Sequence, residues 1–235
     1  MKKVKLFLIK SLVAVFVCFS MIACNESSEK VTFYDMHPVS RFERGSLRTM
    51  MTHNSGRNVN KFELYENDTL TCTADVLYRA DGIICTLNDI QYHIQPDNVL
   101  GATRVRMVKA SKGGALYYEA EYFYINERIG YVKVNAPGIP ESPFQVNFSY
   151  EDSRLTIQEP GGHYSIDLSN EENTGYACNV LGYVNAPLTN QYVINPELYF
   201  LNIYGKPVDK LPGGHEIIRS GKTLRVGTHT YEYRD

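Results

Sequence analysis

Apolar and polar residues alternate along most of the chain that follows residue 31. In the segment 144–150 every second residue is apolar and those between are polar, and segments 70–78 and 164–169 largely repeat the pattern. A period of two predicts strands with one buried and one solvated face. Parallel strands covered on both faces would read as continuous apolar runs, so these strands are predicted to be antiparallel.

Residues that favour turns separate the alternating segments at short intervals. Glycine and asparagine adopt positive φ at little cost, so they close hairpins between consecutive strands. The turn segments are 66–68, 80–82, 112–114, 126–128, 151–153 and 160–162. The sequence therefore predicts a mainly β fold, an antiparallel meander of about 10 to 13 strands that forms a curled sheet or a barrel.

One helix is predicted near the C-terminus. Asn195 is suited to the N-cap, Pro196 to the first helical position, and Gly205 to the end of a helix that covers residues 198–204. Apolar residues surround this helix on nearly every side, so it is expected to be buried and to plug one end or face of the sheet.

The segment 117–125 departs from simple alternation because both of its faces carry aromatic residues. Tyr118, Tyr122 and Tyr124 share one face, and Tyr117 and Phe123 partly occupy the other. Tyrosine combines a flat apolar ring with a polar tip, so Tyr117, Tyr118, Tyr122 and Tyr124 are candidate ligand-binding residues. The alternative is a central strand that a neighbouring loop or helix covers. The chain has no tryptophan, which weakens sugar stacking as the explanation.

The N-terminal segment has the pattern of a bacterial lipoprotein signal. Four lysines in the first ten residues precede an apolar run over 12–22, which is too short to cross roughly 30 Å of hydrocarbon as a helix. Ala23 suits a signal peptidase, and Cys24 is the residue that would carry the lipid. We therefore expect a signal peptide over 1–23, a polar tether over 24–30 and a single β-rich domain over 31–235. Ordinary secretion is the alternative.

The charge balance narrows the range of partners. Without the four leader lysines, 20 of the 24 basic residues remain against 26 acidic ones. A mildly acidic chain argues against nucleic acid, which requires clustered basic residues. It also argues against binding to anionic membrane surfaces. Contact with the membrane is therefore expected through the lipid on Cys24.

Three further cysteines are present in the mature chain. Cys72 and Cys85 lie on neighbouring predicted strands and could form a disulfide across the hairpin, which would leave Cys178 unpaired. We favour the alternative that all three are buried thiols, which behave as small apolar side chains. No pair has the C-x-x-C spacing of zinc sites or thioredoxins.

The sequence contains no recognisable catalytic or metal-binding motif. The six histidines lack the spacing that places two imidazoles on one metal, and no G-x-S-x-G elbow is present. Cys178 has no catalytic signature around it, and the adjacent Glu171 and Glu172 would not face each other across a glycosidic bond. We therefore predict no catalytic residue, no metal and no cofactor.

The chain resembles a family of uncharacterised Bacteroidetes lipoproteins, a domain of unknown function with a porin-like β-meander fold. The resemblance lies in Cys24, the tyrosine-rich strands, the element F-S-Y-E-D-S-R-L-T-I over 148–157, and the helix followed by K-L-P over 210–212. Phe148 and Ser153 depart from the tyrosine and glycine usual there. The family implies a fold and an envelope location but no catalytic residues.

Two short features matter if the source is such an organism. Asp68-Thr69-Leu70 resembles an O-glycosylation tripeptide with Thr69 as acceptor, and an ordinary β-turn is the alternative explanation. Glu26 and Glu29 resemble a sparse version of a surface-export signal. The protein is thus expected on the outer membrane, with periplasmic or surface orientation open.

These observations predict a lipid-anchored cell-envelope protein that acts as a non-enzymatic binding module for a glycan, a peptide or a protein partner. The alternative is a carrier that holds an apolar ligand inside a β-barrel or half-barrel. An enzyme acting on polysaccharide or peptide and a subunit of a surface appendage are further alternatives.

Overall fold

The computed structural model describes residues 25–34, 40–97, 104–172, 188–195, 198–206, 208–219 and 222–234. The predicted signal peptide 1–23, Cys24 and Cys178 lie outside these ranges.

Strands make up most of the described chain. The fifteen strands are β1 (Asn25–Tyr34), β2 (Arg41–Arg44), β3 (Leu47–His53), β4 (Val59–Glu66), β5 (Thr69–Arg79), β6 (Gly82–Leu87), β7 (Ile90–Pro96), β8 (Val105–Lys112), β9 (Ala115–Ile125), β10 (Arg128–Asn135), β11 (Phe144–Glu151), β12 (Arg154–Glu159), β13 (Gly162–Glu172), β14 (Lys210–Arg219) and β15 (Lys222–Arg234). A π-helical turn, η2 (Thr189–Val193), and a 3-10 turn, η3 (Leu198–Leu201), precede β14. No helix within these ranges has the length and hydrophobicity needed to cross a membrane.

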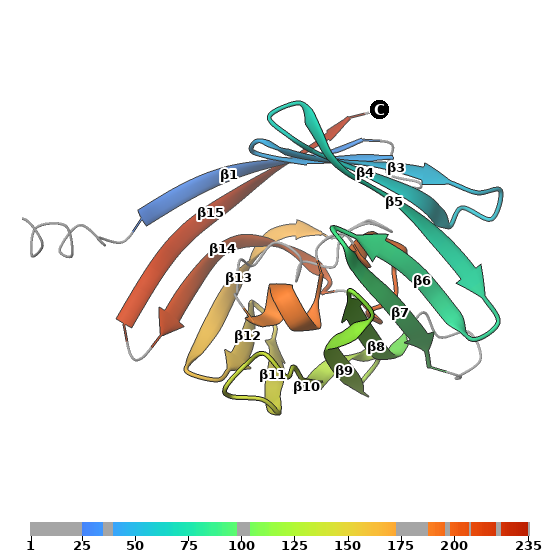
Figure 1. Cartoon of the computed structure of the whole chain (residues 1–235). Coiled ribbons are helices and arrows are strands. Elements are labelled where there is room, and N and C mark those ends of the chain that lie inside the picture. Colours follow the sequence, from blue (N-terminus) through green and yellow to red (C-terminus); the bar gives the residue numbers. More distant parts are fainter. Residues whose placement is uncertain are drawn as a thin grey trace, which may run out of the picture.

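Each strand pairs with the next one in antiparallel fashion, so the predicted meander is confirmed (Figure 1). Strands β2–β15 alone would form a curled sheet. β1 closes the sheet into a barrel because it pairs with β2 on one side and with β15 on the other. Strand direction alternates along a meander, so the first and the fifteenth strand run the same way and their pairing is parallel.

The prediction of a tether over 24–30 is wrong for residues 25–30, which belong to strand β1. Residues 25–30 pair with 225–230 of β15 instead of forming an irregular spacer. The segment lacks apolar periodicity, but strand pairing uses backbone N–H and C=O groups, which every residue here possesses.

The predicted C-terminal helix is much shorter than expected. Asn195 does act as the cap, because its Oδ1 accepts a hydrogen bond from the backbone N–H of Leu198 at 3.2 Å. The helical turn ends at Leu201, since Asn202 has a φ of 53° and Tyr204 forms an isolated bridge with Arg104. The expected burial is confirmed for Leu198, which lies inside the barrel and has no exposed surface.

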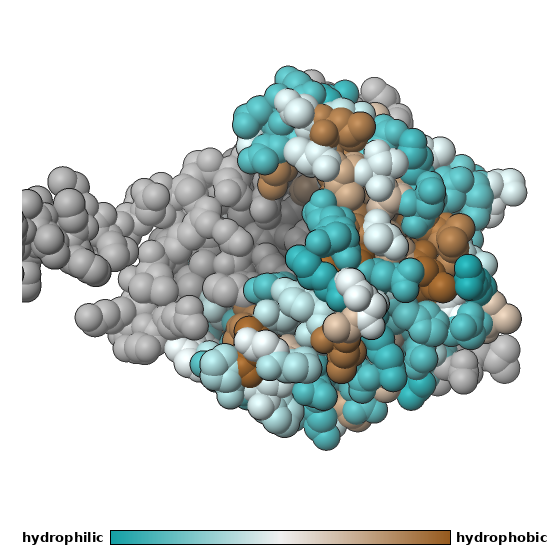
Figure 2. Space-filling view, in the orientation of Figure 1, coloured by the Kyte–Doolittle hydropathy of each residue, from teal (hydrophilic) through white to brown (hydrophobic). Residues whose placement is uncertain are grey.

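The two faces of the barrel wall differ in polarity. Val108, Val132 and Val146 point inward and are at most 1% exposed. Their neighbours Lys109 and Lys133 point outward and are exposed. The face of the molecule seen in Figure 2 is mostly hydrophilic, with scattered hydrophobic side chains. The apolar core therefore lies inside the barrel, where η2 and η3 pack against the strands.

Cys72 and Cys85 are free thiols, as the favoured interpretation predicts, and no disulfide crosses the hairpin. Cys85 pairs in register with Val76, four residues along β5 from Cys72. Four strand residues span roughly 13 Å, whereas a disulfide requires Cα atoms within about 7 Å. Both thiols instead belong to the apolar inner face, partly buried at Cys72 and fully buried at Cys85.

Candidate functional site

The candidate site is centred on β9, the strand that carries the four predicted ligand-binding tyrosines. Tyr118 and Tyr122 lie on the inner face and are 2% and 4% exposed. Tyr117 and Tyr124 are partly buried and pack against the same core. The four side chains therefore do not form one open platform.

The turn η2 covers the inner tyrosines. Its Tyr192 ring meets the Tyr118 ring edge-on, with centroids 5.4 Å apart and an interplanar angle of 90°. The Tyr122 hydroxyl donates a hydrogen bond to the carbonyl of Val193 in the same turn. Tyr204 packs against the other side of Tyr122 at 5.7 Å. For Tyr118 and Tyr122 the structure thus shows the covered-strand arrangement.

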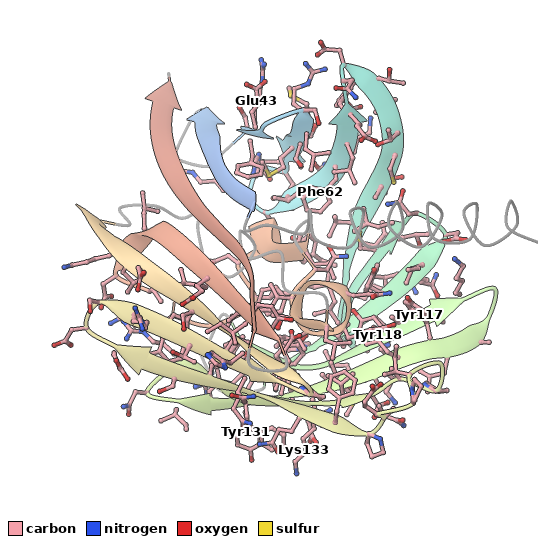
Figure 3. The ribbon with its side chains drawn as sticks, turned by 90° about the vertical axis from the view of Figure 1, so that its left-hand side faces the viewer. Glu43, Phe62, Tyr117, Tyr118, Tyr131 and Lys133 are labelled. Atoms are coloured by element: carbon pink, nitrogen blue, oxygen red, sulfur yellow. The ribbon has the colours of Figure 1, made fainter. Side chains whose placement is uncertain are left out.

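Tyr117 turns inward because of a β-bulge. Ala110 of β8 pairs with Tyr118, but the next residue, Ser111, pairs with Leu116, so Tyr117 is the extra residue. A bulge redirects the side chain of its extra residue. Tyr117 and Tyr118 consequently lie next to each other (Figure 3), with ring centroids 5.7 Å apart. The Tyr117 hydroxyl accepts a hydrogen bond of 2.8 Å from Gln191 Nε2.

The buried hydroxyls of this cluster are neutral at physiological pH. Burial raises the pKa of Tyr118 and Tyr122 well above the ordinary value of 10.0. Burial likewise raises the pKa of Tyr124, whose hydroxyl donates to the Val105 carbonyl at 2.9 Å. Burial and Tyr117 raise the pKa of Tyr192 to about 12. As neutral phenols, Tyr122 and Tyr124 donate hydrogen bonds to backbone carbonyls, and all four rings pack in the apolar core.

A buried carboxylate holds the first residue of η2. Glu159, the last residue of β12, is 3% exposed and accepts hydrogen bonds from the backbone N–H and the hydroxyl of Thr189. The backbone N–H of Leu188 donates to the same carboxylate at 3.4 Å. Burial raises the pKa of Glu159, although these hydrogen bonds oppose the rise. Glu159 therefore fixes the covering turn to the barrel wall.

The outer face of β9 and β10 carries an aromatic pair that the sequence analysis did not group. Phe123 and Tyr131 are opposite each other in register, and their rings stack with centroids 4.4 Å apart and 12° between planes. Lys133 Nζ lies 5.2 Å from the Phe123 centroid and 6.0 Å from the Tyr131 centroid. Tyr131 and Lys133 point away from the barrel interior (Figure 3). We call Phe123, Tyr131 and Lys133 the outer patch.

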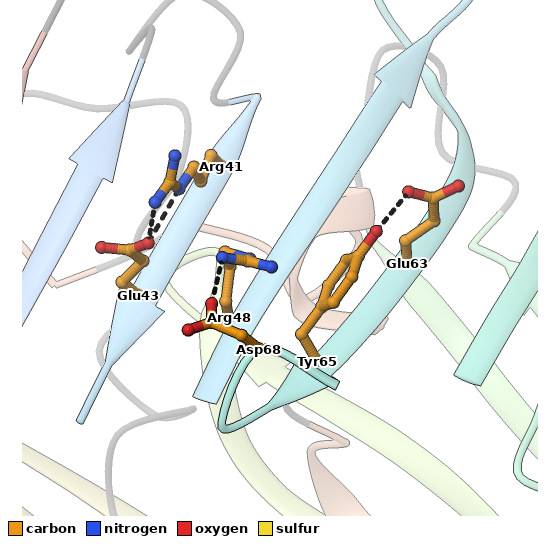
Figure 4. Close-up of polar contacts among 6 residues, drawn as sticks. All are labelled: Arg41, Glu43, Arg48, Glu63, Tyr65 and Asp68. Carbon is orange, nitrogen blue, oxygen red and sulfur yellow. Dashed lines mark hydrogen bonds and ion pairs between the residues drawn. The ribbon is translucent and has the colours of Figure 1, made fainter. Parts of the chain in front are cut away.

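A second cation lies over an aromatic ring on the outer face of β3 and β4 (Figure 4). The Arg48 guanidinium carbon is 4.3 Å from the Tyr65 centroid, and Arg48 also forms an ion pair of 2.7 Å with Asp68. The Tyr65 hydroxyl donates to Glu63 at 3.1 Å, and Lys61 contacts the same carboxylate at 2.6 Å. We call these five residues the outer network.

Thr69 is the first residue of β5 and is exposed. It follows a tight turn in which Asn67 and Asp68 have φ values of 48° and 62°. The side chain is accessible at this position, and its O-glycosylation stays a prediction. Within the described ranges, no group of three or more His, Cys, Asp or Glu side chains could hold a metal ion.

The fold is similar to that of a known structure. No protein-family model matches the sequence, and no curated protein matches it. A porin-like protein from Bacteroides uniformis ATCC 8492 superposes with a TM-score of 0.55 over 82% of this chain and 84% of that chain, at 12% sequence identity. The likeness confirms the predicted porin-like β fold. Membership in the lipoprotein family stays a prediction.

Proposed function

We propose that the protein is a lipid-anchored binding module of the bacterial cell envelope, whose barrel stands in water beside the membrane. Cys24 carries the lipid in this proposal, and the barrel presents its outer wall to a glycan, a peptide or another protein. The polarity of the barrel wall is the main observation that supports this proposal.

A barrel that spans a membrane has an apolar outer band and a polar interior. Strands β8, β10 and β11 have the reverse arrangement, with apolar residues inside and mostly polar residues outside. A charged residue at the bilayer midplane of such a barrel costs roughly 2–4 kcal/mol. Lys109, Lys133 and their exposed neighbours therefore favour a wall that faces water, and membrane attachment then falls to the lipid.

The end of the barrel at which β1 begins is the end that would face the membrane. Turns β2–β3, β4–β5 and β8–β9 lie at this same end, because alternate turns of a meander share an end. Leu47, Leu70 and Leu116 are next to these turns and are 43%, 50% and 47% exposed. With β1 beginning at Asn25, a lipid on Cys24 would hold this rim close to the headgroups.

The described interior favours a binding module over a carrier of apolar ligands. Tyr192, Tyr204 and Leu198 occupy the space inside the strands and are at most 4% exposed. A carried ligand would have to displace them together with the hydrogen bond from Tyr122 to Val193. Of the predicted ligand-binding tyrosines, Tyr117 is partly exposed beside Gln191, so it is the inner alternative that a binding experiment has to test.

Metabolic labelling tests the lipid anchor. Radiolabelled palmitate should mark the wild-type protein and not Cys24→Ala, and the wild type should sediment with membranes. The mature barrel without lipid should stay in solution without detergent. An unlabelled wild type would contradict the anchor, and a barrel that requires detergent would contradict the water-facing wall.

A probe at either end of β9 tests the orientation. A fluorophore at position 116 should be quenched by nitroxide-labelled lipids in vesicles that carry the lipidated protein. The same fluorophore at position 125, on the opposite rim, is the matched control and should stay bright. Equal quenching at both positions would contradict the proposed orientation.

A further inference from the structure

We propose that the outer patch, together with the amide side chains beside it on β11, is a glycan-binding site. The proposal rests on the proposed function as a binding module and names the ligand class and the surface. It moves the site from the predicted tyrosines on the inner face to the outer face of β9, β10 and β11.

The aromatic part of the site is preorganised. Phe123 and Tyr131 project from neighbouring paired strands, and their mutual stacking holds both rings upright at 12° to each other. Each ring has one face covered by the other. Tyr131 also has Asn147 as its register partner on its other side, in β11. A sugar can therefore contact the C–H edge or the free face of a ring that is already ordered.

The polar groups of the outer patch form no ion pair or hydrogen bond with other described residues. The Lys133 ammonium forms no ion pair or hydrogen bond with any described residue, and neither does the Tyr131 hydroxyl. Glu121, the register partner of Lys133 on β9, has no such partner either. The outer network differs, because Arg48, Tyr65 and Glu63 all contact one another or a further charge.

A row of amides extends the site across β11. Gln145 pairs in register with Lys133, and Asn147 pairs with Tyr131. The two amides are exposed and linked by a hydrogen bond of 2.6 Å from Gln145 Nε2 to Asn147 Oδ1. Each amide offers a carbonyl acceptor and N–H donors to a ligand.

This combination fits a polyhydroxylated ligand better than an anion or a peptide strand. Lys133 donates, Glu121 accepts and the amides do both, which matches hydroxyl groups that donate and accept. The opposite charges of Lys133 and Glu121 do not select for an anion. Strand β10 is paired on both sides, with β9 and β11, so a peptide cannot add to it as a further strand.

Affinity gel electrophoresis of the mature barrel tests the proposal. The probes are soluble xylan, galactomannan and amylopectin, with polygalacturonic acid as an acidic comparison. At least one neutral glycan should retard the wild type. Tyr131→Ala should weaken that binding by about fivefold or more, the loss expected for a central aromatic contact. Lys133→Met and Asn147→Ala should each weaken it by a smaller factor.

Two matched variants decide where the glycan binds. Tyr65→Ala removes a partly buried tyrosine under a cation on the opposite wall, and Tyr117→Ala removes the predicted inner tyrosine. Neither should change the binding, and the melting temperature of each variant shows whether it is folded. Lys133→Met deletes the charge at an exposed position, so it keeps the test valid if Tyr131→Ala does not fold.

Three outcomes would overturn the assignment. No retardation by any neutral glycan would reject the ligand class, and retardation by polygalacturonic acid alone would indicate an anion site. Loss of binding in Tyr117→Ala with full binding in Tyr131→Ala would return the site to the inner tyrosines. The palmitate experiment reports on the lipid anchor separately, so the failure of one proposal is distinguishable from the failure of the other.

Discussion

The aromatic residues on the two faces of β9 differ in the packing and hydrogen-bond partners that the chain supplies for them. On the inner face, Tyr118 packs edge-on against Tyr192 and Tyr122 donates to the Val193 carbonyl. On the outer face, Phe123 stacks on Tyr131, whose hydroxyl has no hydrogen-bond partner among the described residues. A buried hydroxyl without a partner is costly, whereas an exposed one bonds to water. The inner aromatics therefore stabilise the fold, and the outer ones are free to meet a ligand.

Exposure alone does not explain why the outer patch is open. The outer network also lies on the outer wall, yet Tyr65 bonds to Glu63 and lies beneath Arg48, which pairs with Asp68 (Figure 4). Both sites place a cation near an aromatic ring. In one of them the chain itself supplies the partners, and in the other a ligand has to supply them.

The largest expected effect comes from deleting an inner ring. Tyr118→Ala leaves a cavity beneath Tyr192 and should lower the free energy of unfolding by about 3–5 kcal/mol. Phe123→Ala, on the outer face of the same strand, should cost only about 0.5–1.5 kcal/mol because it removes a partly exposed stacked pair. Urea unfolding followed by circular dichroism measures both. Equal losses would show that the two faces do not differ in this way.

Removal of single hydroxyls should sharpen the same contrast. Tyr122→Phe leaves the buried Val193 carbonyl without its donor and should cost about 1–3 kcal/mol. Tyr131→Phe removes a hydroxyl without a described partner and should leave the urea midpoint unchanged. Limited proteolysis should cut the Tyr122→Phe protein faster near η2. A loss of stability in Tyr131→Phe would indicate that its hydroxyl does contribute to the fold.

Local patterns in the sequence suffice for much of the fold. Alternation over 144–150 predicts β11 because burial on one side of a strand requires every second residue to be apolar. The turn at Asn67-Asp68 follows from residues that tolerate positive φ. Asn195 is recognisable as a cap because its side chain reaches a backbone N–H three residues later. Each of these signals lies within a few neighbouring residues.

The features that sequence analysis missed depend on contacts between distant segments. β1 is stabilised by backbone pairing with residues some 200 positions away, to which its own side-chain pattern gives no clue. The bulge that turns Tyr117 inward depends on the register between β8 and β9. Glu159 and Thr189 meet only because η2 folds into the barrel. Phe123 and Tyr131 lie on the outer faces of two neighbouring strands. The register of the β9–β10 hairpin is the one signal in the sequence that could have paired them.

The pH dependence of stability should distinguish the buried carboxylate from the exposed ones. Burial raises the pKa of Glu159 above its ordinary value of 4.5. Below pH 4.5 the group is protonated in both the folded and the unfolded chain. As the pH rises through 4.5 towards the folded-state pKa, the unfolded chain loses the proton first, so this group's contribution to stability falls and then levels off.

Glu159→Gln should remove this dependence of the free energy of unfolding on pH. The difference in free energy of unfolding between the wild type and Glu159→Gln should therefore shift in favour of the variant as the pH rises through 4.5, and should level off above the folded-state pKa. Urea unfolding at several pH values measures the difference. Glu63→Gln, on the outer wall, is the control, because Lys61 lowers the pKa of Glu63 and gives the opposite sign. Parallel curves for the wild type and Glu159→Gln would contradict the role of burial.

The smallest effect should come from the charged contacts of the outer network. Asp68→Asn removes the partner of Arg48 at a site where the Asp68 side chain is 88% exposed. Exposed ion pairs contribute about 0.2–1 kcal/mol, and salt screens them. The loss should therefore be measurable at low ionic strength and absent at about 1 M salt. Lys133→Ala should cost at most about 0.5–1 kcal/mol, from its contact with the Phe123 ring, and should show no comparable dependence on salt, because Lys133 has no ion-pair partner among the described residues. If Lys133→Ala lost stability in a salt-dependent way, the outer patch would be part of a paired network like the one around Tyr65, and the contrast on which its role in binding depends would fail.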